Sequence, residues 1–297
     1  MKKIITLLLA LAVVFSLAAC GSSSAPAATE APAATEAPAA TEAPAETEAP
    51  AAETVTVRIG LTGAVYEPIW DVVKAELADE GINLEYVQFS NFSLPNNALA
   101  NGELEMNAFQ HHAYFNNDTS SNGYDLTAIG DTYIVAMDIF SSKISDLSEL
   151  KDGDIIGVPN DVTNEGRALK LLESAGIIEI DPAAGNSPAI NDITKYNVAV
   201  EFQEVDANLV PSILQDVTIA VVNGNYALDA GLKAEDALYK ENEYADNSYY
   251  CLIAVRTEDA ENPVYQRIVE AYQCDAVIEV YNNQFAGFFT PTWTLGQ

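Results

Sequence analysis

Both histidines of this 297-residue chain are adjacent, at His111 and His112, in a short segment rich in aromatic residues. They are poorly placed as metal ligands, because neighbouring side chains diverge on a strand and lie about 100° apart on a helix. Zinc needs three or four ligands, and the chain has no third histidine. We therefore expect no metal and no cofactor. Phe109, Tyr114 and the nearby Phe92 can instead form an aromatic box beside His111, although a purely structural histidine is the more ordinary interpretation.

Arg167 is a candidate for binding a carboxylate. It follows a polar segment that opens a helix, where Thr163 or Asn164 can cap the backbone and free N–H groups favour an anion. A cation in a first helical turn is unfavourable by roughly 0.3–1 kcal/mol. An arginine at this position is well explained by a carboxylate that the planar guanidinium binds with two hydrogen bonds. A salt bridge to one of the many acidic residues explains it equally well.

Asn223 directly follows an apolar segment, at a position where residues of a ligand cleft often lie. Its amide can accept a hydrogen bond from an ammonium group and donate one to a carboxylate. A turn that exploits the backbone tolerance of Asn223 and Gly224 is an equally good interpretation.

No catalytic constellation is evident in the sequence. Cys251 and Cys274 are expected to be buried and unreactive, since neither has an obvious catalytic partner beside it. The sequence contains no Gly-x-Ser-x-Gly elbow, no phosphate-binding Gly-x-x-x-x-Gly-Lys loop and no paired-cysteine metal motif. These absences favour a binding protein over an enzyme.

Alternating strands and helices must position these residues. The alternation over Val55–Leu61 predicts a strand, the apolar spacing over Ile69–Leu77 predicts a helix that stops near Gly81, and Leu84–Phe89 predicts a second strand. A strand, a helix and a strand within such a short stretch form a βαβ unit, which implies a parallel sheet.

The same order of elements returns later in the chain. We expect an α/β protein of two lobes, with a ligand cleft between them beyond the carboxyl ends of the strands. The predicted first lobe comprises 54–136 and 256–297, and the second comprises 137–255. Further strands are predicted at Ile155–Val158, Val198–Val205, Thr218–Val222 and Leu252–Val255. Further helices are predicted from the first turn with Arg167 to Gly176, around Pro211–Gln215 and near the C-terminus.

The first 53 residues are predicted to lie outside the folded lobes. Residues 1–19 resemble an export signal, with two lysines before an apolar stretch that is too short to span a bilayer comfortably. The stretch ends in Leu17–Cys20, which resembles the bacterial lipobox, and we expect Cys20 to be lipidated; an ordinary secretory cleavage site is the alternative. A repeat of proline, alanine, threonine and glutamate follows, and it predicts a disordered linker over 20–53.

The charge of the chain excludes one large class of partners. Thirteen basic residues stand against 44 acidic ones, which gives a formal net charge of −31. Such a negative surface repels phosphate backbones, so no nucleic-acid binding is expected.

Six blocks of the sequence, in order and with similar spacing, resemble the methionine-binding lipoproteins of the MetQ or NlpA type. The resemblance runs from about Val55 to the C-terminus. Its blocks are Phe89–Asn96, Ala98–Gly102, Asn107–Tyr114, Pro159–Arg167, Asn223–Ala227 and Ala254–Arg256.

This resemblance implies a two-lobed periplasmic-binding-protein fold that closes over one amino acid and catalyses no reaction. The expected partners are an amino-acid ligand, an ABC permease and its ATPase. The expected location is the extracytoplasmic face of the cell membrane, where the protein is anchored as a monomer through the lipid on Cys20.

The resemblance also implies roles for individual residues. Phe109, His111 and Tyr114 match positions that surround the ligand in the family. Arg167 matches the arginine that holds the ligand carboxylate, and Asn223 matches an asparagine that contacts its polar end.

Two positions depart from the family pattern. A tyrosine usual in the first block is Phe92 here, and an asparagine usual before the late strand is Cys251. The resemblance implies L-methionine or a closely related small amino acid as the ligand. Loss of a hydroxyl and an amide weakens the polar recognition expected of the family, which makes another amino acid or a short peptide the alternative. A metal-binding surface protein that uses His111 and His112 is a further alternative.

Overall fold

The structure is a computed structural model that describes residues 54–242, 246–285 and 287–295. The predicted signal peptide, Cys20 and the repeat linker lie outside these described residues. The strands are β1 (Val55–Leu61), β2 (Ile82–Gln88), β3 (Met106–Asn107), β4 (Leu126–Val135), β5 (Met137–Phe140), β6 (Ile155–Pro159), β7 (Ile178–Ile180), β8 (Ile193–Tyr196), β9 (Glu201–Val205), β10 (Ile219–Asn223), β11 (Tyr250–Arg256) and β12 (Phe289–Pro291). The α-helices are α1 (Glu67–Leu77), α2 (Pro95–Ala100), α3 (His112–Asn122), α4 (Val162–Ser174), α5 (Gly224–Asp229), α6 (Pro263–Tyr272) and α7 (Asp275–Gln284).

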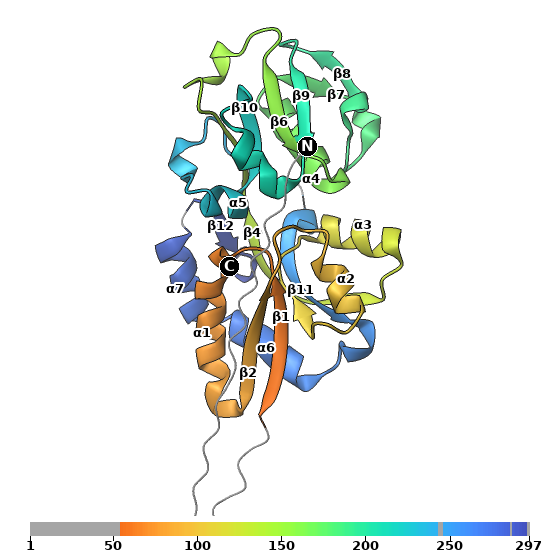
Figure 1. Ribbon diagram of the computed structural model, residues 1–297, viewed down its shortest axis with the longest axis vertical. Helices are drawn as coiled ribbons and strands as arrows, with labels where there is room; N and C mark the ends of the chain where they lie inside the picture. Colours follow the sequence, from red (N-terminus) through yellow and green to blue (C-terminus); the bar gives the residue numbers. More distant parts are fainter. Residues whose placement is uncertain (1–53, 243–245, 286, 296–297) are drawn as a thin grey trace, which may run out of the picture. The chain divides into compact units, whose positions relative to one another are not determined.

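Two main sheets organise these elements (Figure 1). The first has six strands in the order β12-β4-β11-β3-β1-β2, and the second has four in the order β5-β10-β6-β9. In the first sheet β1 runs parallel to β2 and β3, whereas β11 and β12 are antiparallel to their neighbours. In the second sheet β6 runs parallel to β9 and β10, and β5 is antiparallel. The chain is therefore α/β, with parallel cores to which antiparallel strands are added.

The predicted first βαβ unit is confirmed. Strands β1 and β2 pair in parallel over seven residues each, with helix α1 between them. Ile69, Val73 and Leu77 of α1 are fully buried, which is the face that the apolar spacing predicted. After a short 3-10 turn the chain leaves the helix at Gly81, whose φ of 74° is the left-handed conformation that favours glycine.

The observed sheets differ from the predicted division of the chain into lobes at one strand, β11. Strand β11 pairs with β3 and β4 of the six-stranded sheet, although the predicted boundaries placed nearly all of it in the second lobe. It is fully apolar in its centre because the sheet buries it on both faces, so sequence pattern alone does not reveal its sheet. The predicted helix around Pro211–Gln215 is a 3-10 helix over Ala207–Ile213.

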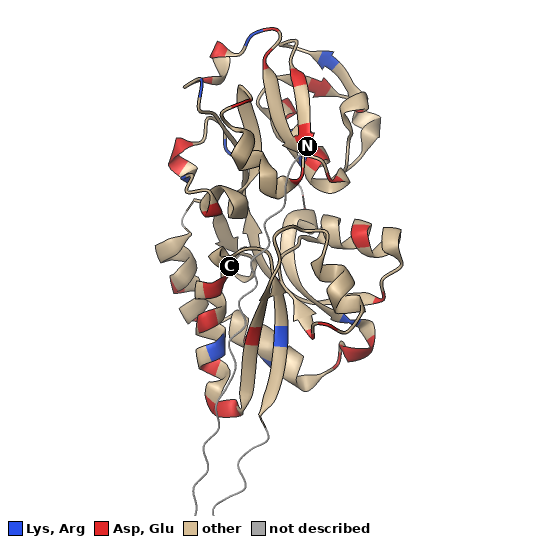
Figure 2. Cartoon of the chain, in the orientation of Figure 1, with Lys and Arg blue, Asp and Glu red and all other residues tan. Residues whose placement is uncertain are grey.

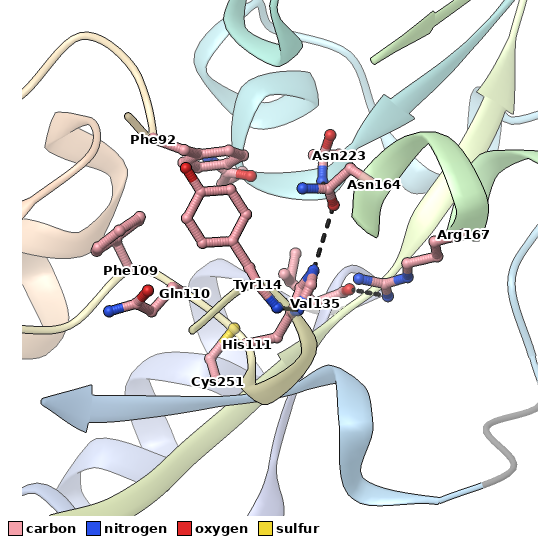
Figure 3. A pocket seen from close by; sticks show the side chains of 11 residues that line it. Phe92, Phe109, Gln110, His111, Tyr114, Val135, Asn164, Arg167, Asn223 and Cys251 are labelled. Carbon is pink, nitrogen blue, oxygen red and sulfur yellow. Dashed lines mark hydrogen bonds between the residues drawn. The ribbon is translucent and has the colours of Figure 1, made fainter. Parts of the chain in front are cut away.

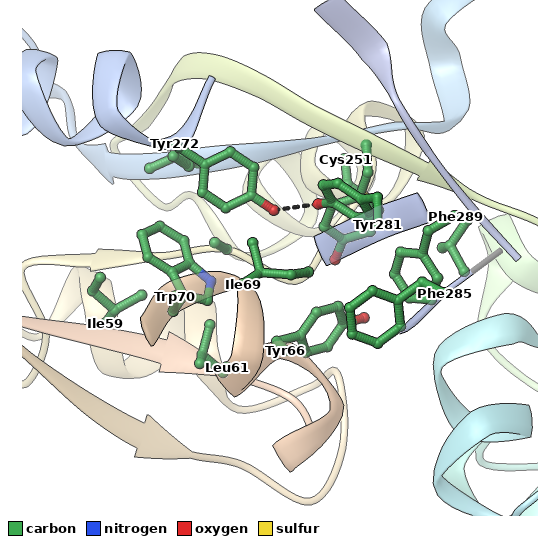
Figure 4. Close-up of a cluster of buried hydrophobic side chains, with 14 of the residues drawn as sticks. Ile59, Leu61, Tyr66, Ile69, Trp70, Cys251, Tyr272, Tyr281, Phe285 and Phe289 are labelled. Atoms are coloured by element: carbon green, nitrogen blue, oxygen red, sulfur yellow. Dashed lines mark hydrogen bonds between the residues drawn. The ribbon is translucent and has the colours of Figure 1, made fainter. Parts of the chain in front are cut away.

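An aromatic core joins the first sheet to the last helices (Figure 4). Trp70 of α1 packs against Tyr272 of α6 with ring centroids 4.9 Å apart. The hydroxyls of Tyr272 and Tyr281 share a hydrogen bond that keeps both buried polar groups paired. Helices α6 and α7 thus pack on the first sheet, as the sequence predicted.

Acidic side chains dominate the charged surface of the described residues, and only a few lysines and arginines lie among them (Figure 2). Among the same residues, none of the helices combines the length and the apolar character needed to cross a bilayer.

Truncation of Trp70 should destabilise this core. Trp70 is 1% exposed, and Trp70→Ala should lower the free energy of unfolding by about 3–5 kcal/mol because a large cavity remains. Leu209→Ala serves as the control, since Leu209 is 47% exposed and its loss should change stability by less than about 0.5 kcal/mol. Urea denaturation followed by circular dichroism measures both, and equal effects of the two substitutions would contradict the assignment of the core.

Candidate functional site

A cavity lies between elements that belong to the two sheets (Figure 3). The space between its lining atoms amounts to about 300 Å³, the part open to solvent included. Its walls combine aromatic rings with buried amides. The lining residues are Phe92, Phe109, Gln110, His111, Tyr114, Val135, Asn164, Arg167, Asn223, Asn225 and Cys251.

Aromatic rings form one wall of the cavity. The ring centroid of Phe92 lies 5.9 Å from those of both Phe109 and Tyr114, and Phe109 and Tyr114 lie 6.0 Å apart. Tyr226 packs behind Phe92 at 4.9 Å, which fixes the ring from the side of α5. This arrangement confirms that the three predicted rings gather in one place, and it offers an apolar surface to a flexible side chain.

His111 is locked at the start of helix α3. Its Nδ1 accepts a hydrogen bond from the backbone N–H of Tyr114, so it caps the helix. Because Nδ1 is the acceptor, Nε2 carries the proton and donates to Asn164 Oδ1 at 3.3 Å. Burial and the charge of Arg167 lower the pKa of His111 to about 3, so the ring is neutral at physiological pH.

A chain of hydrogen bonds orients the amides on the opposite wall. The Asp161 carboxylate, which can only accept, receives both a backbone and a side-chain N–H from Asn164. Asn164 must therefore turn its Oδ1 the other way, where it accepts from His111 and from Asn223 Nδ2 at 2.8 Å. The carbonyl oxygen of the Asn223 amide is consequently the atom left for other contacts.

Two buried amide atoms of this wall have no hydrogen-bond partner within the described residues. They are Asn223 Oδ1 and Asn225 Nδ2, an acceptor and a donor, on side chains that are 4% and 1% exposed. Buried polar groups without partners cost about 1–3 kcal/mol each, so such atoms are expected where a ligand completes the site.

Gly224 explains how this wall approaches the first sheet. Its N–H donates to Ala136 O at 2.9 Å, and a Cβ at this position would lie 2.7 Å from the same oxygen. The backbone of Gly224 has ordinary helical geometry as the first residue of α5, so close approach rather than a left-handed turn requires glycine here.

Arg167 lies at the end of the cavity and is 2% exposed. Its Nε donates to Glu241 Oε1 at 2.8 Å, and its Nη2 donates to Glu241 Oε2 and to Val135 O. The ring of Tyr249 covers the guanidinium at 4.3 Å. The salt-bridge interpretation of Arg167 is thus realised, with a buried partner in place of a surface acid, while the guanidinium still lines the cavity.

The structure brings together all seven residues that the sequence analysis assigned to ligand binding, and their role in binding stays a prediction. It also adds Gln110, Val135, Asn164 and Asn225, which the sequence analysis did not assign to the ligand. Gln110 lies between Phe109 and His111, and Asn225 lies two residues after Asn223, a proximity that could have suggested them.

Two details of the sequence analysis are wrong. Asp161, rather than Thr163 or Asn164, caps helix α4 by accepting from Asn164 N. Arg167 lies in the second turn of α4 and not the first, because the helix begins at Val162. The unfavourable interaction of Arg167 with the helix dipole is therefore weaker than the sequence analysis assumed. Burial of the guanidinium is the reason that Arg167 needs a carboxylate partner.

The two histidines point to different partners. His112 Nε2 lies 2.6 Å from Asp131 Oδ1, while His111 faces the cavity. In the part of the chain that the structure describes, no group of three or more His, Cys, Asp or Glu side chains is placed to hold a metal ion. Cys251 and Cys274 are free thiols. Cys251 is buried as predicted, whereas Cys274 is only partly buried. Burial raises the pKa of Cys251 to about 12, so its sulfur is protonated.

Comparison with known proteins identifies the family to which this chain belongs. The model of the NlpA lipoprotein family matches residues 57–293, which include every lining residue. The chain belongs to the NlpA lipoprotein family. A probable D-methionine-binding lipoprotein MetQ from Pasteurella multocida is 35% identical over 244 residues, which cover 81% of this chain and 86% of that relative. The D-methionine-binding lipoprotein MetQ of Escherichia coli K12 is 33% identical and covers 80% of this chain and 88% of its own length.

Two solved structures agree with the fold. A nutrient binding protein from Burkholderia cenocepacia bound to methionine has a TM-score of 0.76 at 35% identity, covering 80% of this chain and 99% of that chain. The substrate binding protein of a methionine transporter from Streptococcus pneumoniae has a TM-score of 0.77 at 32% identity, covering 80% and 96%. The chain therefore has the two-lobed α/β fold of substrate-binding proteins that the sequence predicted.

His111 should remain neutral over a wide pH range. In a His112→Asn variant only one imidazole is left, and its NMR signals should keep the neutral form from pH 8 down to about pH 5. Because the pKa of His111 is lower in the folded chain than the unperturbed value of about 6.5, its contribution to the free energy of unfolding is complete above pH 6.5 and decreases as the pH falls toward 3. An inflection near pH 6.5 in the folded protein would contradict this burial.

Proposed function

We propose that this protein is a solute-binding protein of an ABC importer that takes L-methionine, or a closely related small amino acid, into the cavity described above. The observation that carries this proposal is the pair of buried, unpartnered amide atoms, Asn223 Oδ1 and Asn225 Nδ2, beside a buried arginine and an aromatic wall. A zwitterion with an apolar side chain supplies a partner for each of these features. Family membership and the methionine-related names of its relatives support the same class.

The polar end of such a ligand fits the amide wall. The hydrogen-bond chain from Asp161 through Asn164 leaves Asn223 Oδ1 as an acceptor, which suits the ligand ammonium group. Asn225 Nδ2 and the cavity-lining Arg167 are donors, which suits the carboxylate.

The apolar end fits the aromatic wall. A thioether beside Phe92, Phe109 and Tyr114 gains about 0.3–1.5 kcal/mol for each favourable sulfur–ring contact. The neutral His111 and the protonated Cys251 add no charge that would disfavour an apolar group.

We further propose that the protein is anchored in the membrane and works with a membrane permease. Relatives named as lipoproteins and the lipobox-like sequence at Cys20 support a lipid anchor on the extracytoplasmic face of the membrane. The linker then lets a monomer of two lobes deliver the ligand to a membrane permease driven by an ATPase. The chain itself carries out no reaction.

A short peptide is the second candidate ligand, because another cavity adjoins the first. The two share Phe92 and Tyr114, and the second is also lined by Asn91, Asn160 and Asp206. A second residue of a peptide could lie there beyond the aromatic wall.

A thermal-shift panel separates these ligands. The panel consists of the twenty amino acids, D-methionine and several methionine-containing dipeptides. A ligand at 100 times its Kd stabilises the native state by about 2.7 kcal/mol, which should raise Tm by roughly 5–10 °C for L-methionine. A large shift with a dipeptide and none with methionine would favour the peptide, and no shift with any amino acid or dipeptide would refute both candidates.

Asn223→Leu should weaken methionine binding without unfolding the protein. The substitution removes the acceptor for the ammonium group, and a hydrogen bond to a charged group is worth about 1.5–3 kcal/mol, so Kd should rise about 10- to 100-fold. Asn97→Leu is the matched control, because Asn97 is exposed on α2 and does not line the cavity. Calorimetry measures both, and a Kd for Asn223→Leu within threefold of the unmodified protein would overturn this role.

A further inference from the structure

The guanidinium at the end of the cavity already has a carboxylate partner from the protein. Glu241 binds Arg167 through both of its oxygens, and its Oε2 also accepts from the backbone N–H of Met137 at 2.9 Å. The backbone N–H of Glu241 donates to Asp138 Oδ1 at 3.0 Å. Glu241 is therefore held from three sides next to strand β5 and is a fixed part of the site.

This pair controls the charge at the carboxylate end of the cavity. Among the lining residues Arg167 alone has a permanently charged side chain, since the His111 ring is neutral and Cys251 is a thiol. Arg167 and Glu241 are 2% and 9% exposed, so water screens their interaction little. A ligand carboxylate would consequently meet an arginine whose positive charge the Glu241 carboxylate already compensates in direct contact.

Two further acidic residues accept hydrogen bonds from residues of this site, Asp138 from Glu241 and Asp161 from Asn164. Asp138 is fully buried, and burial raises its pKa to about 6. Asp161 accepts from Asn164 Nδ2, at the end of that amide opposite to the oxygen that accepts from Asn223. Both favour a ligand that brings a positive group together with its carboxylate.

We propose that Glu241 is a specificity-determining residue, which cancels the charge of Arg167 and so makes the cavity reject ligands that carry a lone negative charge. This inference rests on the proposed function and deepens it, because it names the ligand class as net-neutral zwitterions. A carboxylate without an ammonium group gains little from the compensated arginine and leaves Asn223 Oδ1 unpaired.

The unmodified protein provides the first test. The probes are 4-(methylthio)butanoate, which is methionine without its amino group, and the corresponding uncharged amide. With Glu241 in place, the acid should bind within about tenfold of the amide, and methionine should bind at least 100-fold tighter than the acid. An acid that binds more than 100-fold tighter than the amide would show that the charge of Arg167 is not compensated and would overturn the proposal.

Glu241→Gln provides the second test, because it removes the charge and keeps the size of the side chain. In this variant the affinity of the acid relative to the amide should increase at least tenfold. A purely structural role would weaken both probes equally and leave their ratio unchanged, which would refute the proposal. Circular dichroism shows whether the variant folds. If it does not fold, the comparison of the acid with the amide in the unmodified protein still tests the proposal.

Glu105→Gln is the matched control. Glu105 forms a similar two-oxygen pair with Arg58, with Nε–Oε2 at 2.9 Å and Nη2–Oε1 at 2.7 Å, and also accepts from the Arg58 backbone N–H. Neither residue lines the cavity, so the ratio of the two probes should stay within threefold of its unmodified value. A change equal to that of Glu241→Gln would show that the effect is general and not local.

A measurement of methionine binding distinguishes failure of the proposed function from failure of the role proposed for Glu241. If methionine binds and the ratio does not respond to Glu241→Gln, only the role of Glu241 fails. If another amino acid binds in place of methionine, the acid and amide derived from that compound replace the probes. A protein that binds no amino acid overturns the proposed function and this inference together.

Discussion

The site depends on the burial of a positive charge at Arg167. An arginine that is 2% exposed must be compensated, because an isolated buried ion costs several kcal/mol. Glu241, Val135 O and the ring of Tyr249 supply that compensation from segments before and after the second sheet. The guanidinium therefore joins helix α4 to both chain segments that connect the two sheets, and the geometry of the cavity follows from this junction.

Orientation of the neutral amides follows a second constraint. A carboxylate can only accept hydrogen bonds, so Asp161 decides which way Asn164 turns, and Asn164 decides which way Asn223 turns. The polarity of the cavity wall thus originates in a residue that caps a helix outside the cavity. A similar network holds the other side, where Gln110 exchanges hydrogen bonds with Asn96.

The two positions that depart from the family pattern both line the cavity. Phe92 contributes a ring without a hydroxyl and packs between Tyr114 and Tyr226, which makes that wall more apolar. Cys251 pairs across from His111 in an isolated β-bridge and presents a buried, protonated thiol in place of an amide. Asn223, Asn225 and Arg167 are therefore the residues to which we assign polar recognition in the proposed function.

Local sequence determined the elements and the composition of the site. The alternation over β1, the apolar face of α1 and the left-handed Gly81 are properties of near neighbours. The blocks around His111, Arg167 and Asn223 are also local, since each runs from the end of a strand into the helix that follows. Only the tertiary structure decided that β11 belongs to the first sheet, and that Glu241, 74 residues along the chain, is the partner of Arg167. With 44 acidic residues available, sequence spacing cannot select that one, because the choice depends on how the chain crosses between the two sheets and which carboxylate is buried beside the guanidinium.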